Sequence, residues 1–200
     1  MTEPIDFYFD FSSPYGYFAA ANIDDIAARH GRTVTWRPIL LGAVFKITGQ
    51  QPLPTIPLKG TYAKRDLDRS ARLLRLPFRL PTPFPISSTA PSRAFYSVTD
   101  ADPELARRLA RALYSAYFGE GHDISTPQVT VDVAAKLGID KDTMTQALNE
   151  PAVKDRLRRE VDAALARGVF GSPYIIIDGE PFWGADRLEQ VEKWLSTGGW

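Results

Sequence analysis

The sequence predicts an α/β protein in which a four-stranded mixed β-sheet, with helices on both faces, is interrupted by a large all-helical insertion. Three observations predict this fold class. The chain opens with a strand–helix–strand pattern, it closes with a strand–strand–helix pattern, and the long region between them carries helical patterns only. A length of 200 residues suits one domain that contains such an insertion.

The opening pattern has the length of a parallel βαβ unit. Apolar side chains alternate through residues 5–11, which predicts a strand, and residues 33–37 predict a second one. Between them, residues 14–30 carry the broad apolar stripe of a helix. Ser13 is a favourable N-cap for this helix, and Pro14 is a favourable first residue.

The middle of the chain predicts helices and one loop-rich stretch. Half of the 16 prolines lie between Pro52 and Pro91, so we expect loops there around a single helix at residues 59–74. Further apolar stripes of helical period predict four more helices, at residues 102–118, 126–137, 140–149 and 151–167.

The closing pattern is a β-hairpin followed by a helix. Residues 174–177 are β-branched and aromatic, and residues 180–183 form the predicted return strand. The pair Asp178 and Gly179 between them is a strong signal for a two-residue hairpin turn. A last helix is predicted at residues 187–195.

The element order β-α-β, helices, β-β-α is that of the thioredoxin arrangement with an insertion. We expect residues 1–42 and 168–200 to form a thioredoxin-like domain, and residues 43–167 to form the inserted helical domain. Asp186 is the expected N-cap of the closing helix.

Composition excludes several classes of function. Lysine plus arginine and aspartate plus glutamate number 24 each, and this balance argues against a nucleic-acid partner. The chain has no cysteine and two histidines, so we expect no metal site, no disulfide and no nucleophilic thiol of its own. No stretch resembles a signal peptide or a membrane span, which predicts a cytoplasmic protein without a membrane partner.

Two loops of the predicted sheet converge, and together they suggest a site for a thiol. Ser13 begins the first helix, where free N–H groups favour an anion such as a thiolate. Pro173, just before a strand, is a candidate for a cis peptide bond, and such a turn would present the backbone N–H and C=O of Ser172 outward to an extended peptide. Because the chain lacks cysteine, a visiting thiol is expected, and glutathione is the abundant one.

Structural roles are the alternatives for these residues. Ser13 alone is typical of an ordinary N-cap, and the pair Ser172 and Pro173 alone is typical of a turn. A serine hydrolase built from Ser13 and His122 is disfavoured because the Gly-x-Ser-x-Gly motif is absent.

Three sequence blocks carry a resemblance to a known family. Residues 7–15, 168–173 and 182–188 resemble the 2-hydroxychromene-2-carboxylate isomerases, which are related to kappa-class glutathione transferases and bacterial disulfide oxidoreductases. Residues 62–69 and the pair Leu76–Pro77 extend the likeness through the middle of the chain. The resemblance implies a thioredoxin fold with a helical insertion, glutathione as cofactor and a homodimer.

The resemblance also implies roles for single residues. Ser13 matches the active-site serine, and Ser172, which precedes Pro173, matches the residue whose backbone holds the cysteinyl part of glutathione. The segment that holds the γ-glutamyl end corresponds to Trp183, Gly184, Ala185 and Asp186. A carboxylate at Asp186 suits the glutamyl ammonium group.

The substrate implied by the resemblance is a small aromatic keto acid or chromene, held between the thioredoxin part and the insertion. Phe45, Lys46 and Phe84 are the candidates here, with Lys46 pairing a carboxylate and Phe84 stacking on a ring. The plain alternative is that Lys46 is a solvated charge and Phe84 belongs to the core. A polar pair found in some members is replaced here by Leu53 and Pro54, which leaves the substrate open.

The expected function is a glutathione-dependent cis–trans isomerisation in the degradation of aromatic compounds. Reversible addition of the thiolate would turn a conjugated double bond into a single bond that rotates. One alternative is a glutathione transferase that acts on another electrophile. The other is a redox-inactive thioredoxin-like module that binds extended peptides beside Ser172 and Pro173.

Overall fold

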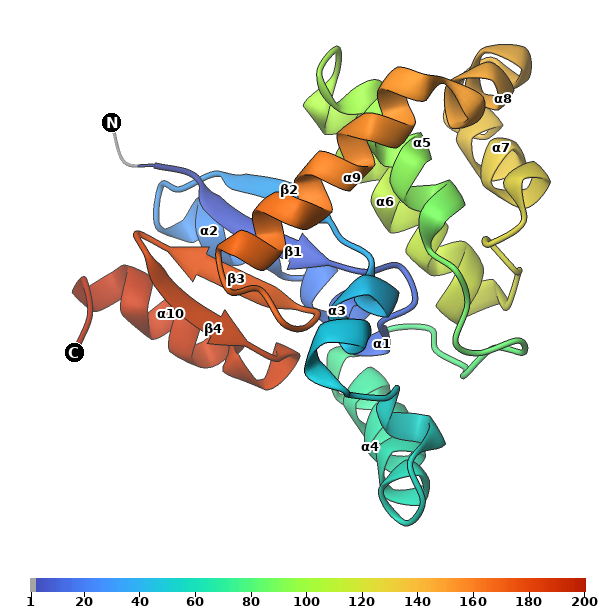
Figure 1. Ribbon diagram of the computed structural model, residues 1–200. Coiled ribbons are helices and arrows are strands. Elements are labelled where there is room, and N and C mark those ends of the chain that lie inside the picture. Colours follow the sequence, from blue (N-terminus) through green and yellow to red (C-terminus); the bar gives the residue numbers. More distant parts are fainter. Residues whose placement is uncertain (1–2) are drawn as a thin grey trace.

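The computed structural model describes residues 3–200 and confirms the predicted sheet (Figure 1). In this part of the chain the sheet has the strand order β2-β1-β3-β4. β1 pairs in parallel with β2 and antiparallel with β3, and β4 completes the antiparallel hairpin. The strands span Ile5–Phe9 (β1), Val34–Pro38 (β2), Tyr174–Ile177 (β3) and Glu180–Trp183 (β4).

One face of the sheet carries the main core. Ile5, Phe7 and Phe9 point into it from β1. The helices α1 (Pro14–Ala20), α2 (Ile23–Arg29) and α10 (Leu188–Thr197) contribute to the same core. The ring centroid of Phe9 lies 5.9 Å from that of Phe95 and 5.8 Å from that of Tyr114. Both of these partners belong to the helices between β2 and β3, so one core joins them to the sheet.

The opposite face of the sheet has a smaller apolar cluster. Tyr8 and Tyr174 lie in it together with Leu41, Val44 and Ala164. These last three come from α3 (Leu41–Thr48) and from the end of α9 (Pro151–Ala166), and Figure 1 shows α9 passing across this face. The division of the chain at residues 43 and 167 into two domains remains a prediction.

The other helices form the remainder of the connection between β2 and β3. They are α4 (Lys59–Leu74), α5 (Thr89–Thr99), α6 (Pro103–Tyr114), α7 (Pro127–Ala135) and α8 (Lys141–Asn149). Short helical turns occur at Leu53–Thr55 and Ala185–Arg187, and a π-helix at Ser115–Glu120. Figure 1 shows α4 projecting as an arm away from the other helices.

The predicted helix at residues 14–30 is two helices. It breaks between α1 and α2 at Asn22, whose φ of −124° is not helical and whose side-chain amide donates to the carbonyl of Phe18. Asparagine competes in this way for backbone hydrogen bonds and favours helix ends. Gly31 ends α2 with φ of 65°, which is cheap for glycine alone.

Two helices were not predicted, α3 and α5. The loop-rich stretch predicted between Pro52 and Pro91 reaches only the start of α5, and no element was predicted for the rest of this helix, where Ala94, Phe95 and Tyr96 are buried. Tertiary burial therefore overrides a weak local helix signal. The prediction of Asp186 as N-cap is wrong, because α10 begins at Leu188 without a side-chain cap and Asp186 instead pairs with Arg187 at 3.1 Å.

Within residues 3–200, no helix combines the length and the apolar character that a membrane crossing requires.

Candidate functional site

Ser13 lies where the first strand passes into the first helix. Its Oγ accepts a hydrogen bond from the N–H of Gly16 at 3.0 Å, so it is the N-cap of α1, and Pro14 is the first helical residue, as predicted. The same hydroxyl donates to the carbonyl oxygen of Ser172 at 2.8 Å. The peptide bond between Ser172 and Pro173 is cis. The structure thus brings the two candidate loops together.

The first turn of α1 lies directly on the cis-proline turn. A Cβ added to Gly16 would stand 2.6 Å from the Oη of Tyr114 and 2.8 Å from the Oγ of Ser172. Atoms do not approach so closely without displacement. Gly16 therefore permits the short distance between helix and turn.

The backbone of Ser172 has a carbonyl that is in use and, among the described residues, an N–H that is free. Its carbonyl accepts the hydroxyl of Ser13 with one of its two acceptor positions, and its presentation to a peptide stays a prediction. Its N–H has no acceptor among residues 3–200. A donor for an extended ligand therefore remains on this turn.

Asp10 is a residue of this region that the sequence analysis missed. It directly follows β1, it is 1% exposed, and burial raises the pKa of its carboxyl. Its carboxylate accepts hydrogen bonds from Ser12, Leu41 and Ser88. The available signal was an acidic residue at the end of an otherwise apolar, alternating strand.

The segment expected to hold a γ-glutamyl group lies beside the same turn. The N–H of Gly184 donates to the carbonyl of Pro173 at 3.1 Å, so the end of β4 follows the cis-proline residue. Gly184 has φ of 114°, and a Cβ there would collide with the Oδ1 of Asp186. Asp186 and the neighbouring Ala185 lie in the helical turn before α10, and the side chain of Asp186 is 73% exposed. Its carboxylate is accessible to a cation.

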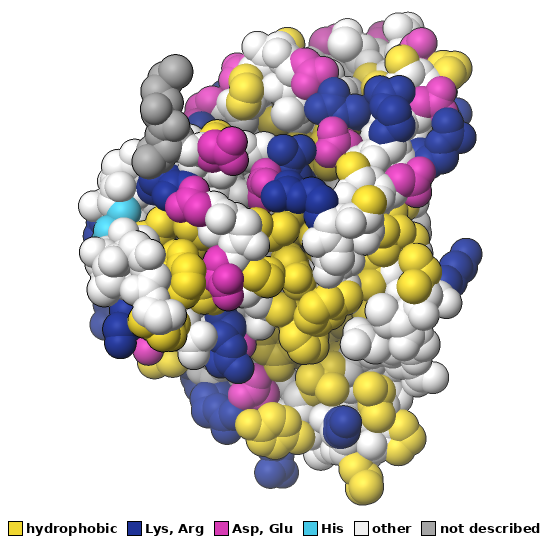
Figure 2. All heavy atoms as spheres, turned by 60° about the vertical axis from the view of Figure 1, so that its left-hand side comes forward, with side chains coloured by type: hydrophobic (Ala, Val, Ile, Leu, Met, Phe, Trp, Pro, Cys, Tyr) yellow, Lys and Arg dark blue, Asp and Glu magenta, His cyan; other side chains and the backbone are white. Residues whose placement is uncertain are grey.

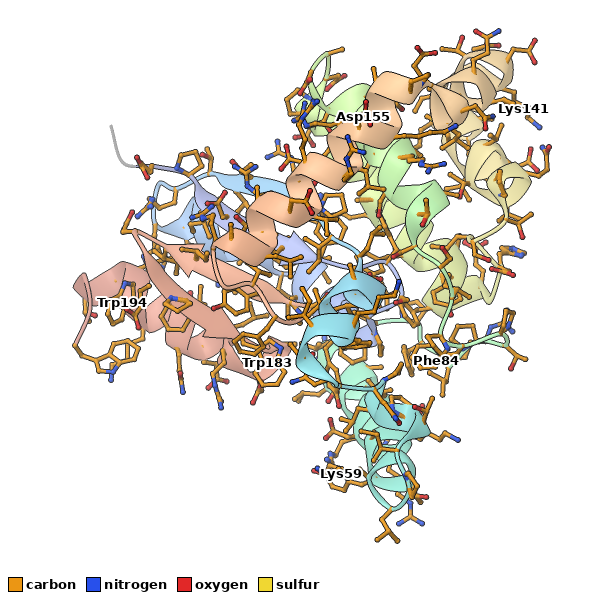
Figure 3. All side chains as sticks on the ribbon, viewed as in Figure 1. Lys59, Phe84, Lys141, Asp155, Trp183 and Trp194 are labelled. Atoms are coloured by element: carbon orange, nitrogen blue, oxygen red, sulfur yellow. The ribbon has the colours of Figure 1, made fainter. Side chains whose placement is uncertain are left out.

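Trp183 closes the other side of the turn. Its indole lies on Gly171, where a Cβ would collide with the indole Nε1, and its ring centroid is 4.9 Å from that of Phe170. Trp183 is half exposed, and Figure 3 shows it at the end of β4, on the side toward α3. The indole of Trp183 thus occupies space that is open only because Gly171, next to Ser172, has no side chain.

We expect Gly171→Ala to displace this indole. The added methyl group cannot be accommodated unless Trp183 moves, so we expect a loss of about 1–3 kcal/mol in the free energy of unfolding. The fluorescence of Trp183 should also change, as measured against the Trp183→Phe variant. Gly42→Ala is the matched control, because a Cβ there meets open space in α3 and alanine favours a helix. Unchanged stability and fluorescence in Gly171→Ala would contradict this account of the turn.

The three candidate substrate residues lie on two separate segments, Phe45 and Lys46 on α3 and Phe84 on the loop before α5. Lys46 is exposed on α3 and forms no ion pair in the described part of the chain. Phe45 packs partly against the smaller apolar cluster, and Phe84 packs partly against the main core. Figure 3 shows Phe84 on the loop before α5, on the other side of α3 from Trp183. No contact places any of these three against Ser13, and their substrate roles remain predictions.

A second contact near Ser13 was missed by the sequence analysis. The hydroxyl of Tyr15 donates to Oδ2 of Asp66 on α4 at 2.8 Å, and burial and this carboxylate raise the pKa of Tyr15. This bond ties the helix that begins at Ser13 to the projecting arm. Nothing local in the sequence pairs residues so far apart.

No group of histidine and acidic side chains in residues 3–200 has the geometry to hold a metal ion.

Comparison with known proteins identifies the family of this chain. The family model described as a DSBA-like thioredoxin domain matches residues 4–196. A 2-hydroxychromene-2-carboxylate isomerase of Sphingobium xenophagum is 30% identical over 201 residues, which cover 98% of this chain and 99% of the relative. Glutathione S-transferase kappa 2 of Caenorhabditis elegans is 31% identical over 205 residues, covering 96% and 91%.

A solved structure of a 2-hydroxychromene-2-carboxylate isomerase has the same fold. It superposes with a TM-score of 0.86 at 30% identity, over 97% of this chain and 95% of that one. The cytosolic disulfide reductase DsbM from Pseudomonas aeruginosa, with a TM-score of 0.66 at 17% identity over 97% and 96% of the two chains, shares the fold. The chain therefore belongs to the DsbA-like thioredoxin family, and it is an enzyme of the group that contains the 2-hydroxychromene-2-carboxylate isomerases and the kappa-class glutathione transferases.

Proposed function

We propose that this enzyme is a glutathione-dependent cis–trans isomerase that acts on a 2-hydroxychromene-2-carboxylate or a closely similar aromatic keto acid. The contact that carries the proposal is the one between Ser13, at the N-terminus of α1, and Ser172, before the cis-proline. A chain without cysteine has placed a hydroxyl and a helix N-terminus where a thiolate would be stabilised. The relatives named above support the choice of glutathione.

The residues present fit this tripeptide. The N–H of Ser172 is a donor for the backbone of its cysteinyl residue, and the carboxylate of Asp186 suits its ammonium group. The N–H of Tyr15, the second residue of α1, also has no acceptor in residues 3–200 and lies in the same turn as Ser13. These donors and the carboxylate match the ends of a zwitterionic peptide.

The residues of this chain would stabilise the charge of the thiolate and orient the substrate. Bound glutathione supplies a thiolate that adds reversibly to a conjugated double bond and so allows that bond to rotate. The hydroxyl of Ser13 can turn from the carbonyl of Ser172 to donate to the sulfur. The N-terminus of α1 stabilises the same charge. Lys46 would pair with the substrate carboxylate, and Phe45 and Phe84 would contact its ring.

The second candidate function is a glutathione transferase on another electrophile. One observation favours it: a kappa-class transferase is among the relatives. The family resemblance adds to this, because it implies a polar pair in some isomerases where this chain has Leu53 and Pro54. The thiol site would be the same. The two functions differ in the fate of the glutathione conjugate. A transferase releases the conjugate, whereas an isomerase eliminates glutathione from it.

The test is to incubate the enzyme with 2-hydroxychromene-2-carboxylate, with and without glutathione, and to follow the trans product by absorbance. We expect product only when glutathione is present, with no consumption of the thiol. Stable consumption of glutathione with a conjugated product would identify a transferase. No reaction, together with no effect of millimolar glutathione on the melting temperature, would contradict both functions, because a ligand of the folded state raises that temperature.

A homodimer is part of the proposal. Several large apolar side chains are exposed on the arm and the segment before it: Ile47, Leu53, Leu58, Tyr62 and Leu73. Leu58 is 93% exposed. Figure 2 shows apolar side chains gathered over the middle and lower end of one face of the molecule. A second copy of the chain would bury such surface.

We expect light scattering to give about twice the chain mass of 22.3 kDa. Leu58→Glu should weaken the dimer by about tenfold or more, because a buried charge at an apolar contact is costly. Thr145→Glu adds the same charge on an exposed position of α8 and should leave the mass unchanged. A wild-type protein that scatters as a monomer at 100 µM would contradict the homodimer.

A further inference from the structure

Asp10 is a buried acid that the proposed chemistry does not use. Its Oδ1 accepts from the N–H and the hydroxyl of Ser12, both at 2.7 Å. Its Oδ2 accepts from the N–H of Leu41 at 2.6 Å and from the hydroxyl of Ser88 at 2.9 Å. Leu41 is the first residue of α3, and Ser88 is the N-cap residue of α5. One carboxylate therefore joins the loop of Ser13 to two helices of the connection.

Burial raises the pKa of the Asp10 carboxyl, and the hydrogen bonds from Leu41, Ser12 and Ser88 oppose that rise by favouring the ionised form. Each carboxylate oxygen faces a backbone N–H, from Ser12 on one side and from Leu41 on the other. A hydroxyl can reverse its role in a hydrogen bond, but a backbone N–H can only donate. A protonated acid would offer one of the two N–H groups a weaker acceptor, and an amide would leave one of them without an acceptor, which is costly in a buried site.

The backbone of Asp10 reaches both parts of the thiol site. Its N–H donates to the Oγ of Ser172 at 2.8 Å. Its carbonyl accepts the N–H of Ser13 at 2.8 Å and the hydroxyl of Tyr114 at 2.9 Å. The position of Ser13 relative to the cis-proline turn therefore depends on this residue.

The charge of Asp10 has no counter-charge nearby. No lysine or arginine within residues 3–200 forms an ion pair with it. The titratable groups coupled to it are the phenols of Tyr114 and Tyr117. Burial raises the pKa of both, with a further rise from Asp10 at Tyr114 and from Asp123 and Asp10 at Tyr117, so both are neutral near pH 7. Lys46 on α3 is exposed and makes no contact with it. A buried charge without a partner acts strongly on its surroundings, because little solvent screens it.

We propose that Asp10 is a positioning residue of the thiol site, and that its buried negative charge opposes the ionisation of a thiol bound between Ser13 and Ser172. The inference rests on the proposed function, since it concerns the same bound glutathione. The N-terminus of α1 stabilises the thiolate of bound glutathione, and the negative charge of Asp10 partly offsets that stabilisation. A less strongly stabilised thiolate is the better nucleophile, because nucleophilicity falls as the thiol becomes more acidic.

The test is a pH titration of the thiolate absorbance of bound glutathione in the wild-type protein and in Asp10→Asn. We expect the midpoint to fall by about one pH unit in the variant, as expected when a like charge is removed. Asp6→Asn is the matched control, because Asp6 lies on β1 shortly before Asp10 and its carboxylate is paired with Arg37 and Arg167. Its midpoint should equal that of the wild type. An unchanged midpoint in a folded Asp10→Asn protein would overturn the inference.

If Asp10→Asn does not fold, a measurement on the wild-type protein tests the same inference. The ¹³C resonance of the Asp10 carboxyl should show a step at the pH at which bound glutathione ionises. S-methylglutathione, which has no ionisable sulfur, should give no such step. The absence of a step with glutathione would overturn the inference while leaving the proposed function intact. A wild-type protein that binds no glutathione by calorimetry would instead remove the proposed function, and this inference with it.

Discussion

Ser13→Ala should lower the rate of the glutathione-dependent isomerisation by about 100-fold, as is typical when one donor to a developing charge is removed. Ser13 is 5% exposed and its hydroxyl donates to Ser172, so water does not readily replace that hydroxyl. Glutathione should still bind, because the N–H of Ser172 and the carboxylate of Asp186 are unchanged. The midpoint of the thiolate absorbance should move to higher pH, since the anion has lost a donor.

Comparing the reaction rate and the thiolate titration with the melting temperature separates this role of Ser13 from that of a helix cap. Loss of the bond from the N–H of Gly16 costs about 1 kcal/mol of stability, which lowers the melting temperature by a few degrees in a chain of this length. Ser92→Ala is the control, because Ser92 is buried and its hydroxyl has no partner among the described residues. A Ser13→Ala protein with a lower melting temperature but an unchanged rate and thiolate titration would show that Ser13 only caps the helix.

The sheet could be predicted from the sequence because its signals are local. Apolar side chains alternate along β1, and in the turn of the closing hairpin Asp178 and Gly179 have φ of 51° and 93°. Both values are those that a two-residue hairpin requires and that this pair adopts cheaply. Ser13 and Pro14 likewise mark the start of α1 by residue type alone.

The rest of the site depends on partners far away in the chain. Asp10 accepts from Leu41 and Ser88, which follow it by 31 and 78 residues. No local pattern predicts such pairs. The helix α5 escaped prediction for the same reason, since Phe95 is helical because it packs on Phe9 and its neighbours. The contact between Tyr15 and Asp66 is a third example.

Gly16→Ala should destabilise the fold by about 1–3 kcal/mol, although alanine has the higher helix propensity by about 1 kcal/mol. The new methyl group would stand 2.6 Å from the Oη of Tyr114 and 2.8 Å from the Oγ of Ser172. Neither oxygen can move away without breaking a hydrogen bond to the backbone of Asp10. The hydroxyl of Tyr114 donates to the carbonyl of Asp10, and the hydroxyl of Ser172 accepts from the N–H of Asp10. The first turn of α1 must therefore move away from the cis-proline turn, and glutathione should bind at least tenfold more weakly.

A double-mutant cycle tests whether this crowding is the cause. Tyr114→Phe removes the Oη that the methyl group would meet, at the cost of one buried hydrogen bond. In Gly16→Ala/Tyr114→Phe, the loss of unfolding free energy should be smaller than the sum of the two single losses, because the two changes relieve the same contact. Strict additivity, measured by chemical denaturation, would show that Tyr114 does not restrict position 16. Gly42→Ala should raise stability, since that glycine also lies in a helix but meets open space. The distance between α1 and the turn of Ser172, on which the proposed thiol site depends, is thus set by a residue that has no side chain.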